Sequence, residues 1–352
     1  MKAFILIAFA GCLDQQPTTD TDVAALGGET WTTVDDNDGT VGAGAFDYSI
    51  AVNPNTSKIM MTGYRREADG TSTAIIRGQK PGAGWGLNST YKTNLESSTG
   101  RKIVVDHNNN WYVWISGSGA NGATHDILRW SNNDGASWTT RFDDVPMVGP
   151  GTKVSDIFVD GGGRLFVLRE TRGTIEMSTD HGVTFSSSSA GGTPEHLCEV
   201  VYGGTTTIYS LGSGSVASTD LGTTWHAVPL PSGPCSQAQA GTIAIGQFHG
   251  GGTYNGVTGA LVQPMSLPDE SVPVFDGVNQ KAYFVGHENG YWWVEREDGA
   301  IKDVYTLDLN AAQDARAFGG TYDSEMGLYV VGTSMDDAIS NPPIHGIVRH
   351  RQ

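Results

Sequence analysis

Arginine, histidine, tyrosine and carboxylate side chains collect in the segments that join the predicted β-strands. An arginine guanidinium binds a carboxylate through two parallel hydrogen bonds, and a tyrosine beside a glutamate, with an aspartic acid nearby, can cleave a glycosidic bond. The spacing of these residues does not itself require that they meet at one point. They therefore predict a ligand-binding face and no catalytic residue. The candidate ligand residues are Arg65, Arg101, Arg169, His249, Tyr254, His287, Glu288 and Arg316.

The other chemistry-bearing patterns do not form metal or cofactor motifs. Residues Asp35 to Gly39 are rich in acidic side chains, but Val34 stands where a calcium-binding loop begins with an aspartate. The nine histidines show none of the paired spacings of a metal site. The sequence contains no glycine-rich phosphate loop and no Gly-x-Ser-x-Gly elbow. We therefore predict no metal and no cofactor.

Composition indicates an acidic all-β protein. The formal net charge is -17, and the 21 lysines and arginines are scattered rather than clustered, which excludes a nucleic-acid partner. Forty-eight glycines and short alternating apolar runs favour many half-buried strands joined by tight turns. A protein or a glycan is the predicted partner.

An eight-residue pattern, Ser-x-Asx-x-Gly-x-Ser/Thr-aromatic, occurs three times. The Asp or Asn side chain can bind backbone amides of a tight turn, the glycine supplies a positive φ, and the aromatic ring packs behind the hairpin. This pattern predicts structure rather than catalysis. Its key residues are Ser131, Asn133, Gly135 and Trp138; Ser178, Asp180, Gly182 and Phe185; and Ser218, Asp220, Gly222 and Trp225.

These three segments resemble the Asp-box, or BNR repeat, of sialidase-like β-propellers. The resemblance implies that the motifs lie on the outer part of the blades, away from the ligand. It also implies that ligands meet the opposite face, formed by loops between the second and third strands of each blade and by crossovers into the next blade. His249 to Asn255 is predicted to be one of these loops, with glycines 250–252 open to close approach by a partner.

A second pattern precedes the eight-residue motifs: an apolar strand, a short turn, and another apolar strand. Six such hairpins and a compressed seventh, at residues 237–245, give units of about 40 to 50 residues, the length of one four-stranded propeller blade. We predict a single all-β propeller with seven four-stranded blades. Six blades are the alternative, with the fifth unit as an elaborated loop. The last unit lacks an outer strand, which residues 29–34 are predicted to supply, so that N- and C-terminal strands close the ring.

The opening strand separates this chain from the sialidases that it resembles. Sialidases of that family carry an Arg-Ile-Pro motif there, whereas this chain has Phe46 to Val52 without arginine or proline. We therefore predict a binding propeller without a catalytic centre. One alternative is a glycoside hydrolase of sialidase type, in which Arg65, Arg101 and Arg316 would converge. Another is an assembly factor for a membrane complex.

The N-terminal segment predicts export and lipid anchoring. A short apolar run ends in Phe9-Ala10-Gly11-Cys12, which resembles the lipobox of bacterial lipoproteins, with a simply cleaved signal as the alternative. The predicted organisation is a signal peptide at residues 1–11, lipidated Cys12 followed by a flexible tether to residue 28, and the propeller at residues 29–352. Leu13 after the cysteine resembles the sorting signal for the outer membrane, so we expect the chain to be held in the bacterial cell envelope.

Two further cysteines, Cys198 and Cys235, begin inner strands of consecutive repeats. This placement brings them near one another. In an exported protein a disulfide between them is expected, and two buried thiols are the alternative.

Overall fold

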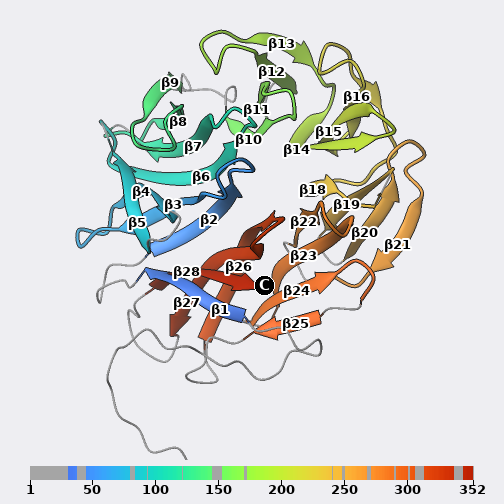
Figure 1. The fold of residues 1–352 in the computed structure, drawn as a ribbon. Helices are drawn as coiled ribbons and strands as arrows, with labels where there is room; N and C mark the ends of the chain where they lie inside the picture. Colours follow the sequence, from blue (N-terminus) through green and yellow to red (C-terminus); the bar gives the residue numbers. More distant parts are fainter. Residues whose placement is uncertain are drawn as a thin grey trace, which may run out of the picture.

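The computed structural model describes residues 31–37, 45–79, 84–92, 94–120, 122–144, 153–169, 173–239, 241–247, 250–267, 271–288, 291–299, 302–305, 313–336 and 344–351. These residues form seven antiparallel sheets of four strands each. The sheets are arranged in a ring, like the blades of a propeller (Figure 1). The prediction of seven blades is confirmed, and the six-bladed alternative is wrong because the fifth unit forms a complete sheet.

The first three blades use strands β2 to β13 in chain order. Blade 1 contains β2 (Ala45–Val52), β3 (Ile59–Arg66), β4 (Ser72–Gln79) and β5 (Trp85–Tyr91). Blade 2 contains β6 (Ser97–Val105), β7 (Trp111–Ser118), β8 (Thr124–Ser131) and β9 (Thr139–Asp144). Blade 3 contains β10 (Val154–Val159), β11 (Leu165–Arg169), β12 (Thr174–Ser178) and β13 (Ser186–Ser189).

The next three blades continue the same order. Blade 4 contains β14 (Thr193–Tyr202), β15 (Thr205–Ser213), β16 (Val216–Ser218) and β17 (His226–Ala227). Blade 5 contains β18 (Cys235–Gln237), β19 (Thr242–Gln247), β20 (Gly250–Asn255) and β21 (Leu261–Met265). Blade 6 contains β22 (Val272–Asp276), β23 (Lys281–Glu288), β24 (Tyr291–Arg296) and β25 (Lys302–Tyr305).

Blade 7 closes the ring with strands from both ends of the described chain. It contains β26 (Gln313–Asp323), β27 (Gly327–Asp336), β28 (Ile344–Arg351) and, outermost, β1 (Trp31–Asn37). Strand β1 runs antiparallel to β28, with Trp31 opposite Arg351. The predicted closure is confirmed, and it removes the exposed edge that β28 would otherwise present.

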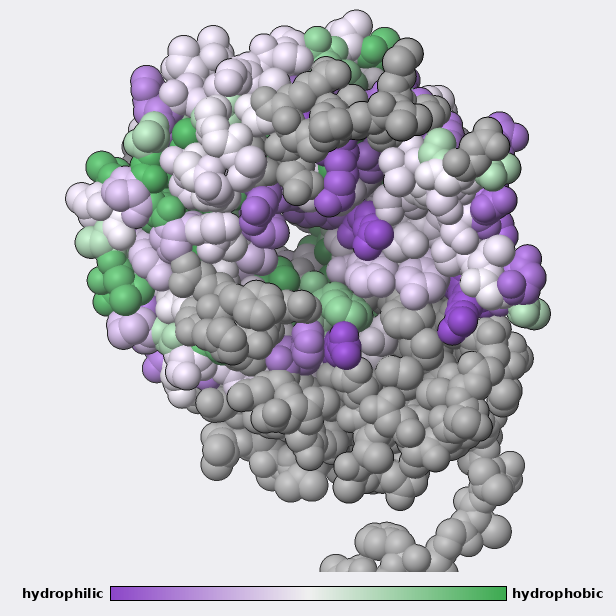
Figure 2. Space-filling model, turned by 180° about the vertical axis from the view of Figure 1, so that it is seen from behind, coloured by the Kyte–Doolittle hydropathy of each residue, from purple (hydrophilic) through white to green (hydrophobic). Residues whose placement is uncertain are grey.

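The first strand of each blade lies nearest the central opening, and the fourth lies at the rim (Figure 1). Seen from behind that view, hydrophilic residues border the opening on its upper and lateral sides and hydrophobic residues border it below (Figure 2). Two faces follow from this topology. We call the face that carries the turns between first and second strands, and between third and fourth strands, the turn face. The opposite face, with the hairpins between second and third strands and the crossovers, is the crossover face.

The hydrophobic core is divided among the blade interfaces. Among the described residues, each pair of adjacent blades encloses one cluster of buried side chains. Met60 of blade 1, for example, packs with Ile103 and Trp111 of blade 2. Alternation along each strand sends one side chain toward the preceding blade and the next toward the following blade. Burial therefore holds the ring together at every seam.

An Asp or Asn side chain organises the turn between the first two strands in five blades. In blade 3, Asp160 Oδ1 accepts hydrogen bonds from the backbone N–H groups of Gly162 at 2.9 Å and Arg164 at 2.8 Å. These side chains are buried, which fixes each turn against the ring. The five residues are Asn53, Asp106, Asp160, Asp276 and Asp323.

The three eight-residue segments form turns between third and fourth strands, which we call the repeat turns (residues 131–138, 178–185 and 218–225). In the second, Ser178 Oγ accepts a hydrogen bond from Gly182 N–H at 2.8 Å and donates one to Asp180 Oδ1 at 2.8 Å. Asp180 also accepts from the backbone N–H and the hydroxyl of Thr184, at 2.8 and 2.6 Å. The third repeat turn makes the same bonds. The first makes the same backbone and serine bonds, but its Asn133 amide donates to the Ser137 hydroxyl instead of accepting from it.

Each repeat turn also packs against the preceding blade. A Cβ on Gly222 would lie 2.7 Å from the ring of Phe166 in blade 3, and the glycine has φ +87°. The indole N–H of Trp225 donates to Ser188 Oγ of blade 3 at 3.0 Å. The glycine and the aromatic residue of this motif are therefore selected by contact between blades as well as by the turn itself.

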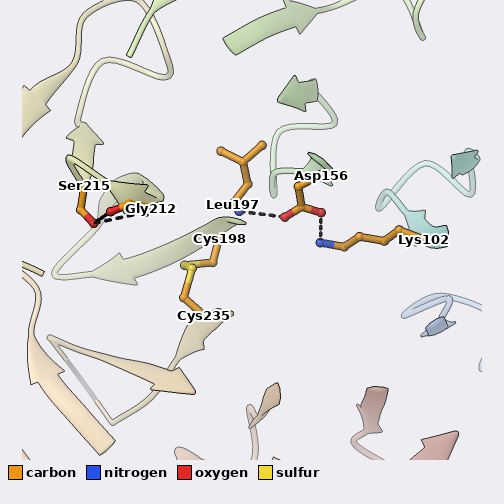
Figure 3. The surroundings of a disulfide bond; sticks show 7 residues. All are labelled: Lys102, Asp156, Leu197, Cys198, Gly212, Ser215 and Cys235. Atoms are coloured by element: carbon orange, nitrogen blue, oxygen red, sulfur yellow. Dashed lines mark hydrogen bonds and ion pairs between the residues drawn. A yellow bond between two sulfur atoms is a disulfide. The ribbon is translucent and has the colours of Figure 1, made fainter. Parts of the chain in front are cut away.

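Polar and covalent links join the inner strands of blades 2 to 5 (Figure 3). Lys102 Nζ donates to Asp156 Oδ1 at 2.5 Å, and Asp156 Oδ2 accepts from the backbone N–H of Leu197 at 2.8 Å. One residue further along β14, Cys198 forms a disulfide with Cys235 of β18, with a Cα–Cα distance of 5.7 Å. Four successive blades are thus tied together close to the central opening.

Candidate functional site

Five inner strands contain a β-bulge at the same level of the ring. The register with the second strand shifts by one residue in β2, β6, β10, β14 and β26. A bulge leaves one residue unpaired and redirects its side chain. These bulges lie at the midpoint of the strand or on its crossover-face side, because each first-to-second turn comes later in the chain. The bulge residues are Tyr48, Arg101, Ser155, Glu195 and Phe318.

Aromatic rings from three blades meet at this level. The ring of Tyr48 lies 6.0 Å from that of Tyr64 on β3 and 5.2 Å from that of Phe318 on β26. Phe318 in turn lies 6.2 Å from the imidazole of His287 on β23, edge to face. Arg101 of β6 places its guanidinium 5.8 Å from the centre of the Tyr48 ring. We call these five residues the mouth cluster; they bring together blades 6, 7, 1 and 2.

Two exposed arginines of this region have no carboxylate partner among the described residues. Arg101 Nε donates to Ser116 Oγ at 2.7 Å, which fixes the guanidinium and leaves its terminal N–H groups for other acceptors. Arg66 lies two residues after Tyr64 on the same strand and is also exposed. Arg65, by contrast, is paired with Glu67 at 2.9 Å. In a chain of net charge -17, such cations indicate a place for an anionic group.

Tyr64 is protonated at neutral pH. Burial raises the pKa of its hydroxyl well above the ordinary value, and the neighbouring Tyr48 raises it further. The charges of Arg66 and Arg101 act in the opposite direction but are outweighed. The phenol is therefore a hydrogen-bonding and stacking group rather than an activated nucleophile.

The inner strands of blades 3 and 4 have a different character. Glu195 is exposed, and its Oε2 accepts a hydrogen bond from Ser232 at 3.1 Å. Burial lowers the pKa of His196, the next residue, so this imidazole is favoured in its neutral form. The bulge residues thus change in character around the ring: they are aromatic in blades 7 and 1, cationic in blade 2 and anionic in blade 4.

The structure brings some of the predicted ligand residues together and separates others. Arg101 and His287 belong to the mouth cluster, and exposed Arg316 lies two residues before Phe318 on β26. Glu288 lies at the end of β23, and His249 and Cys12 lie outside the described residues. Arg169 is buried and forms ion pairs with Asp144 at 2.6 Å and Glu176 at 3.0 Å, so it is committed to holding blades 2 and 3 together.

The predicted loop from His249 to Asn255 is wrong, because residues 250–255 form strand β20. Tyr254 lies beside the turn at residues 255–260, on the turn face, and packs in the core between blades 4 and 5. A Cβ on Gly251 would lie 2.3 Å from Leu267 Cδ1, and one on Gly252 2.1 Å from the carbonyl oxygen of Gln263. These glycines allow close packing within the blade, not the approach of a partner.

Sequence reasoning missed Tyr48, Tyr64, Phe318 and Arg66 as members of one site. The sequence shows aromatic residues within apolar strands, where core packing is the usual explanation. The bulges at Tyr48 and Phe318 redirect these side chains, and a bulge leaves no reliable mark in the sequence. Tyr48 and Phe318 both lie four to six residues before a first-to-second turn. This shared position is the sequence signal that could have placed them together.

The turn face carries a separate cleft between blades 1 and 2, of about 620 Å³. Lys58, Asn88 and the repeat turn at Asn133 to Ala136 line it. Its polar groups are largely engaged: Lys58 donates to the carbonyl of Asp134, and the indole N–H of Trp111 donates to the Asp134 carboxylate at 3.0 Å. This cleft is therefore mainly a seam between blades.

Metal sites and membrane-spanning helices are both absent from the described residues. No group of three or more His, Cys, Asp or Glu side chains among them is placed to hold a metal ion. Within the same residues, no helix has the length and apolar character needed to cross a bilayer.

Comparisons with known proteins identify the fold. No protein-family model matches the chain, and no curated protein matches it. A structure of virginiamycin B lyase from Staphylococcus aureus, a catalytically inactive variant with quinupristin, is similar with a TM-score of 0.57 and 11% identity, over 89% of this chain and 98% of that one. A streptogramin B lyase structure is similar with a TM-score of 0.57 and 13% identity, over 94% of this chain and 100% of that one. YCF48 with a bound D1 peptide is similar with a TM-score of 0.57 and 13% identity, over 96% of each chain. At these identities the likeness shows a shared seven-bladed propeller fold and no more.

Proposed function

We propose that this protein is an exported lipoprotein whose propeller binds a carboxylate-bearing protein or glycan at the mouth cluster, without catalysis. The observation that carries the proposal is the pair of exposed arginines, Arg66 and Arg101, beside the adjacent rings of Tyr48, Tyr64 and Phe318. An arginine offers a fork of donors that fits a carboxylate, and aromatic faces accept the apolar side of a sugar ring or a peptide side chain.

The chemistry at the mouth supports binding over hydrolysis. A sialidase-type reaction needs a tyrosine activated by a glutamate. Here burial raises the pKa of Tyr64, and its hydrogen-bond partner Tyr48 raises it further. Among the described residues, Glu67 is engaged by Arg65, and Glu195 belongs to blade 4 on a different part of the ring. Neither of these two glutamates is therefore placed to activate Tyr64.

The anchoring part of the proposal depends on the segment around Cys12. The Cys198–Cys235 disulfide agrees with it, because such bonds persist in oxidising compartments outside the cytosol. Replacing Cys12 by Ala should move the protein from the membrane fraction to the soluble fraction. Continued sedimentation of the C12A chain with membranes would contradict lipid anchoring at this residue.

We also propose that the repeat turns are Asp-boxes. Their side-chain oxygens are used within the turns, with Ser218 and Thr224 both bonded to Asp220, and their glycines pack against the preceding blade. These turns lie on the face opposite the mouth cluster. We therefore propose a structural role for these turns and no contact with the ligand.

The test measures binding and turnover of the same probes. The C12A chain would be titrated calorimetrically with 3′-sialyllactose, lactose, an acidic peptide with a free C-terminus and the amidated form of that peptide. Each mixture would afterwards be analysed by mass spectrometry. We expect a carboxylate-bearing probe to bind better than its neutral counterpart and to be recovered intact.

A matched pair of variants locates the site. Arg101→Gln should weaken binding about ten-fold or more, because it removes a charged hydrogen-bond donor. Arg296→Gln changes an arginine paired with Asp298 in blade 6 and should leave binding unchanged. Equal binding of neutral probes, or equal loss in both variants, would contradict the proposed site. Released sialic acid would instead establish the alternative, a sialidase-type hydrolase.

A further inference from the structure

One stretch of the chain contains no Asp, Glu, Lys or Arg. It runs from Leu221 to Pro268 and includes every strand of blade 5. The rest of the chain carries 38 acidic and 21 basic residues. Blade 5 therefore contains no Asp, Glu, Lys or Arg and only one histidine, although the protein as a whole is strongly acidic.

Exposed apolar side chains gather on the same sector. The blade 5 patch consists of Val201 and Tyr202 of blade 4 with Val257, Leu261 and Val262 of blade 5, all exposed. In Figure 2, hydrophobic residues gather along the left edge of the disc, which is the edge with β16, β20 and β21 at the right of Figure 1. Most of the large hydrophobic side chains that are exposed in the described chain belong to this patch.

The two parts of the patch are continuous. The ring of Tyr202 lies against Gly241, with a Cβ position at 3.6 Å, and the carbonyl of Gly241 accepts a hydrogen bond from Gly256 N–H at 3.5 Å. Val257 follows directly. The first turns of blades 4 and 5 and the outer turn of blade 5 therefore share one surface on the turn face.

The outer turn of blade 5 holds the patch in place. It is not a repeat turn: Asn255 Oδ1 accepts from the backbone N–H groups of Val257 at 3.0 Å and Thr258 at 2.8 Å. A Cβ on Gly259 would lie 2.3 Å from the carbonyl oxygen of Pro229, so the turn is seated on the preceding segment. Val257 is left at the tip with 84% of its surface exposed. A fixed, exposed valine is pre-arranged for contact with another surface.

We infer that the blade 5 patch is the contact through which two copies of this chain associate. Two copies that each carry a formal charge of -17 repel one another wherever their carboxylates approach. At physiological ionic strength this repulsion fades beyond about 8 Å. A contact centred on the charge-free sector keeps the carboxylates of both copies away from the interface, while burying apolar side chains.

The contact is made by side chains rather than by strand addition. Strand β21 is the edge of blade 5, but Pro264 lacks a backbone donor and the strand is bulged beside Tyr254. Both features prevent an edge from pairing with another strand. The nearest repeat turn, with Asp220, packs against blade 3 through Gly222. On the other side, Gln263 of β21 donates to the backbone carbonyl of Glu297, and Lys281 and Arg296 pair there with the carboxylates of Glu297 and Asp298.

Sedimentation velocity of the C12A chain over a range of concentrations tests the inference. We expect a monomer–dimer equilibrium that shifts toward the dimer as salt is raised. Val257→Glu should weaken association at least ten-fold, because it buries an unpaired charge at the contact. Val183→Glu is the matched control, since Val183 is 60% exposed on a repeat turn of blade 3 and should not affect association.

Thermal unfolding of each variant confirms that it is folded, and Val262→Glu provides a second variant if Val257→Glu fails this check. A wild-type chain that stays monomeric up to concentrations on the order of 100 μM would overturn the inference. So would a dimer that survives both Val257→Glu and Val262→Glu, or one that Val183→Glu disrupts equally. This result does not depend on the ligand of the mouth cluster.

Discussion

Blades 4 and 5 have the same four-stranded topology but are held in different ways. Blade 4 ends in a repeat turn, in which Ser218, Asp220 and Thr224 bond to one another and to the backbone. Blade 5 has no repeat turn and no charged residue to build one, and its inner strand is joined to blade 4 by the Cys198–Cys235 disulfide. A covalent bond near the opening thus accompanies a different turn near the rim, which Asn255 organises in place of an aspartate.

This difference teaches that the sheet itself does not specify how a blade is attached. Blades 3 and 4 are fastened to their predecessors through the glycines and aromatic residues of their repeat turns, as with Gly222 and Trp225 against blade 3. Blade 5 is fastened in two ways, because Gly256 and Gly259 of its outer turn pack against Tyr209 and Pro229 while the disulfide links its inner strand to blade 4. The charge-free surface that results is the one we assign to self-association.

The largest expected effect is loss of the disulfide. Cys235→Ser removes a cross-link between residues 37 apart in sequence, which should lower the free energy of unfolding by about 4 kcal/mol on the chain-entropy model. Denaturant unfolding of the C12A chain with and without Cys235→Ser measures this. Adding a reductant should lower the stability of the parent chain and leave the variant unchanged. Equal stabilities in all four conditions would show that blade 5 does not rely on the bond.

A smaller effect is expected at the outside of blade 4. Gly222→Ala introduces a Cβ 2.7 Å from Phe166 at a positive φ, and should cost about 3 kcal/mol from strain and overpacking together. Gly299→Ala is the control, because Gly299 also has a positive φ but nothing within 4 Å, so only about 1 kcal/mol of strain is expected. Denaturant midpoints compare the two. Equal losses would mean that the contact with blade 3 contributes nothing.

The fold was predictable because its determinants are local and repeated. The hairpin pattern and the repeat turns recur about every 40 to 50 residues and predicted the seven blades, and the single unpaired strand near the N-terminus predicted the closure by β1. Blade 5 was predicted less well. Its glycines 250–252 indicate a loop by composition, but they lie in strand β20, where Leu267 and Gln263 leave no room for a larger side chain. That crowding involves residues from a neighbouring strand and a following segment, which composition does not show.

The mouth cluster was only partly predictable, for a different physical reason. Arg101 and His287 stand out by residue type, whereas Tyr48 and Phe318 depend on bulges that arise from pairing between strands. Arg169 has the same side chain as Arg101 but is consumed by Asp144 and Glu176. Whether an arginine is available is decided by which carboxylates the fold places beside it, and these come from other strands.

The smallest expected effect on stability comes from replacing an aspartate of a repeat turn by asparagine, the residue that blade 2 has at the same position. Hydrogen bonds from the hydroxyl and backbone N–H of Thr224, and from Ser218, lower the pKa of Asp220 to about 2 from its ordinary value of 3.8. Because the folded-state pKa lies below the unfolded-state value, this contribution to stability is fully present above about pH 4 and is lost as the pH falls toward 2.

Asn133 occupies this position in blade 2 and makes the equivalent bonds to Ser137 without titrating. Asp220→Asn should therefore lower stability slightly at pH 6 and reduce the further loss between pH 4 and pH 2.5, measured by denaturant midpoints. The protonation of His196, whose pKa is lowered by burial, reduces stability of both proteins below about pH 6.5 and cancels in the comparison. Identical acid dependence in the two proteins would mean that the Asp220 carboxylate does not hold the turn, and that the serine and the glycine alone fasten blade 4 where the disulfide fastens blade 5.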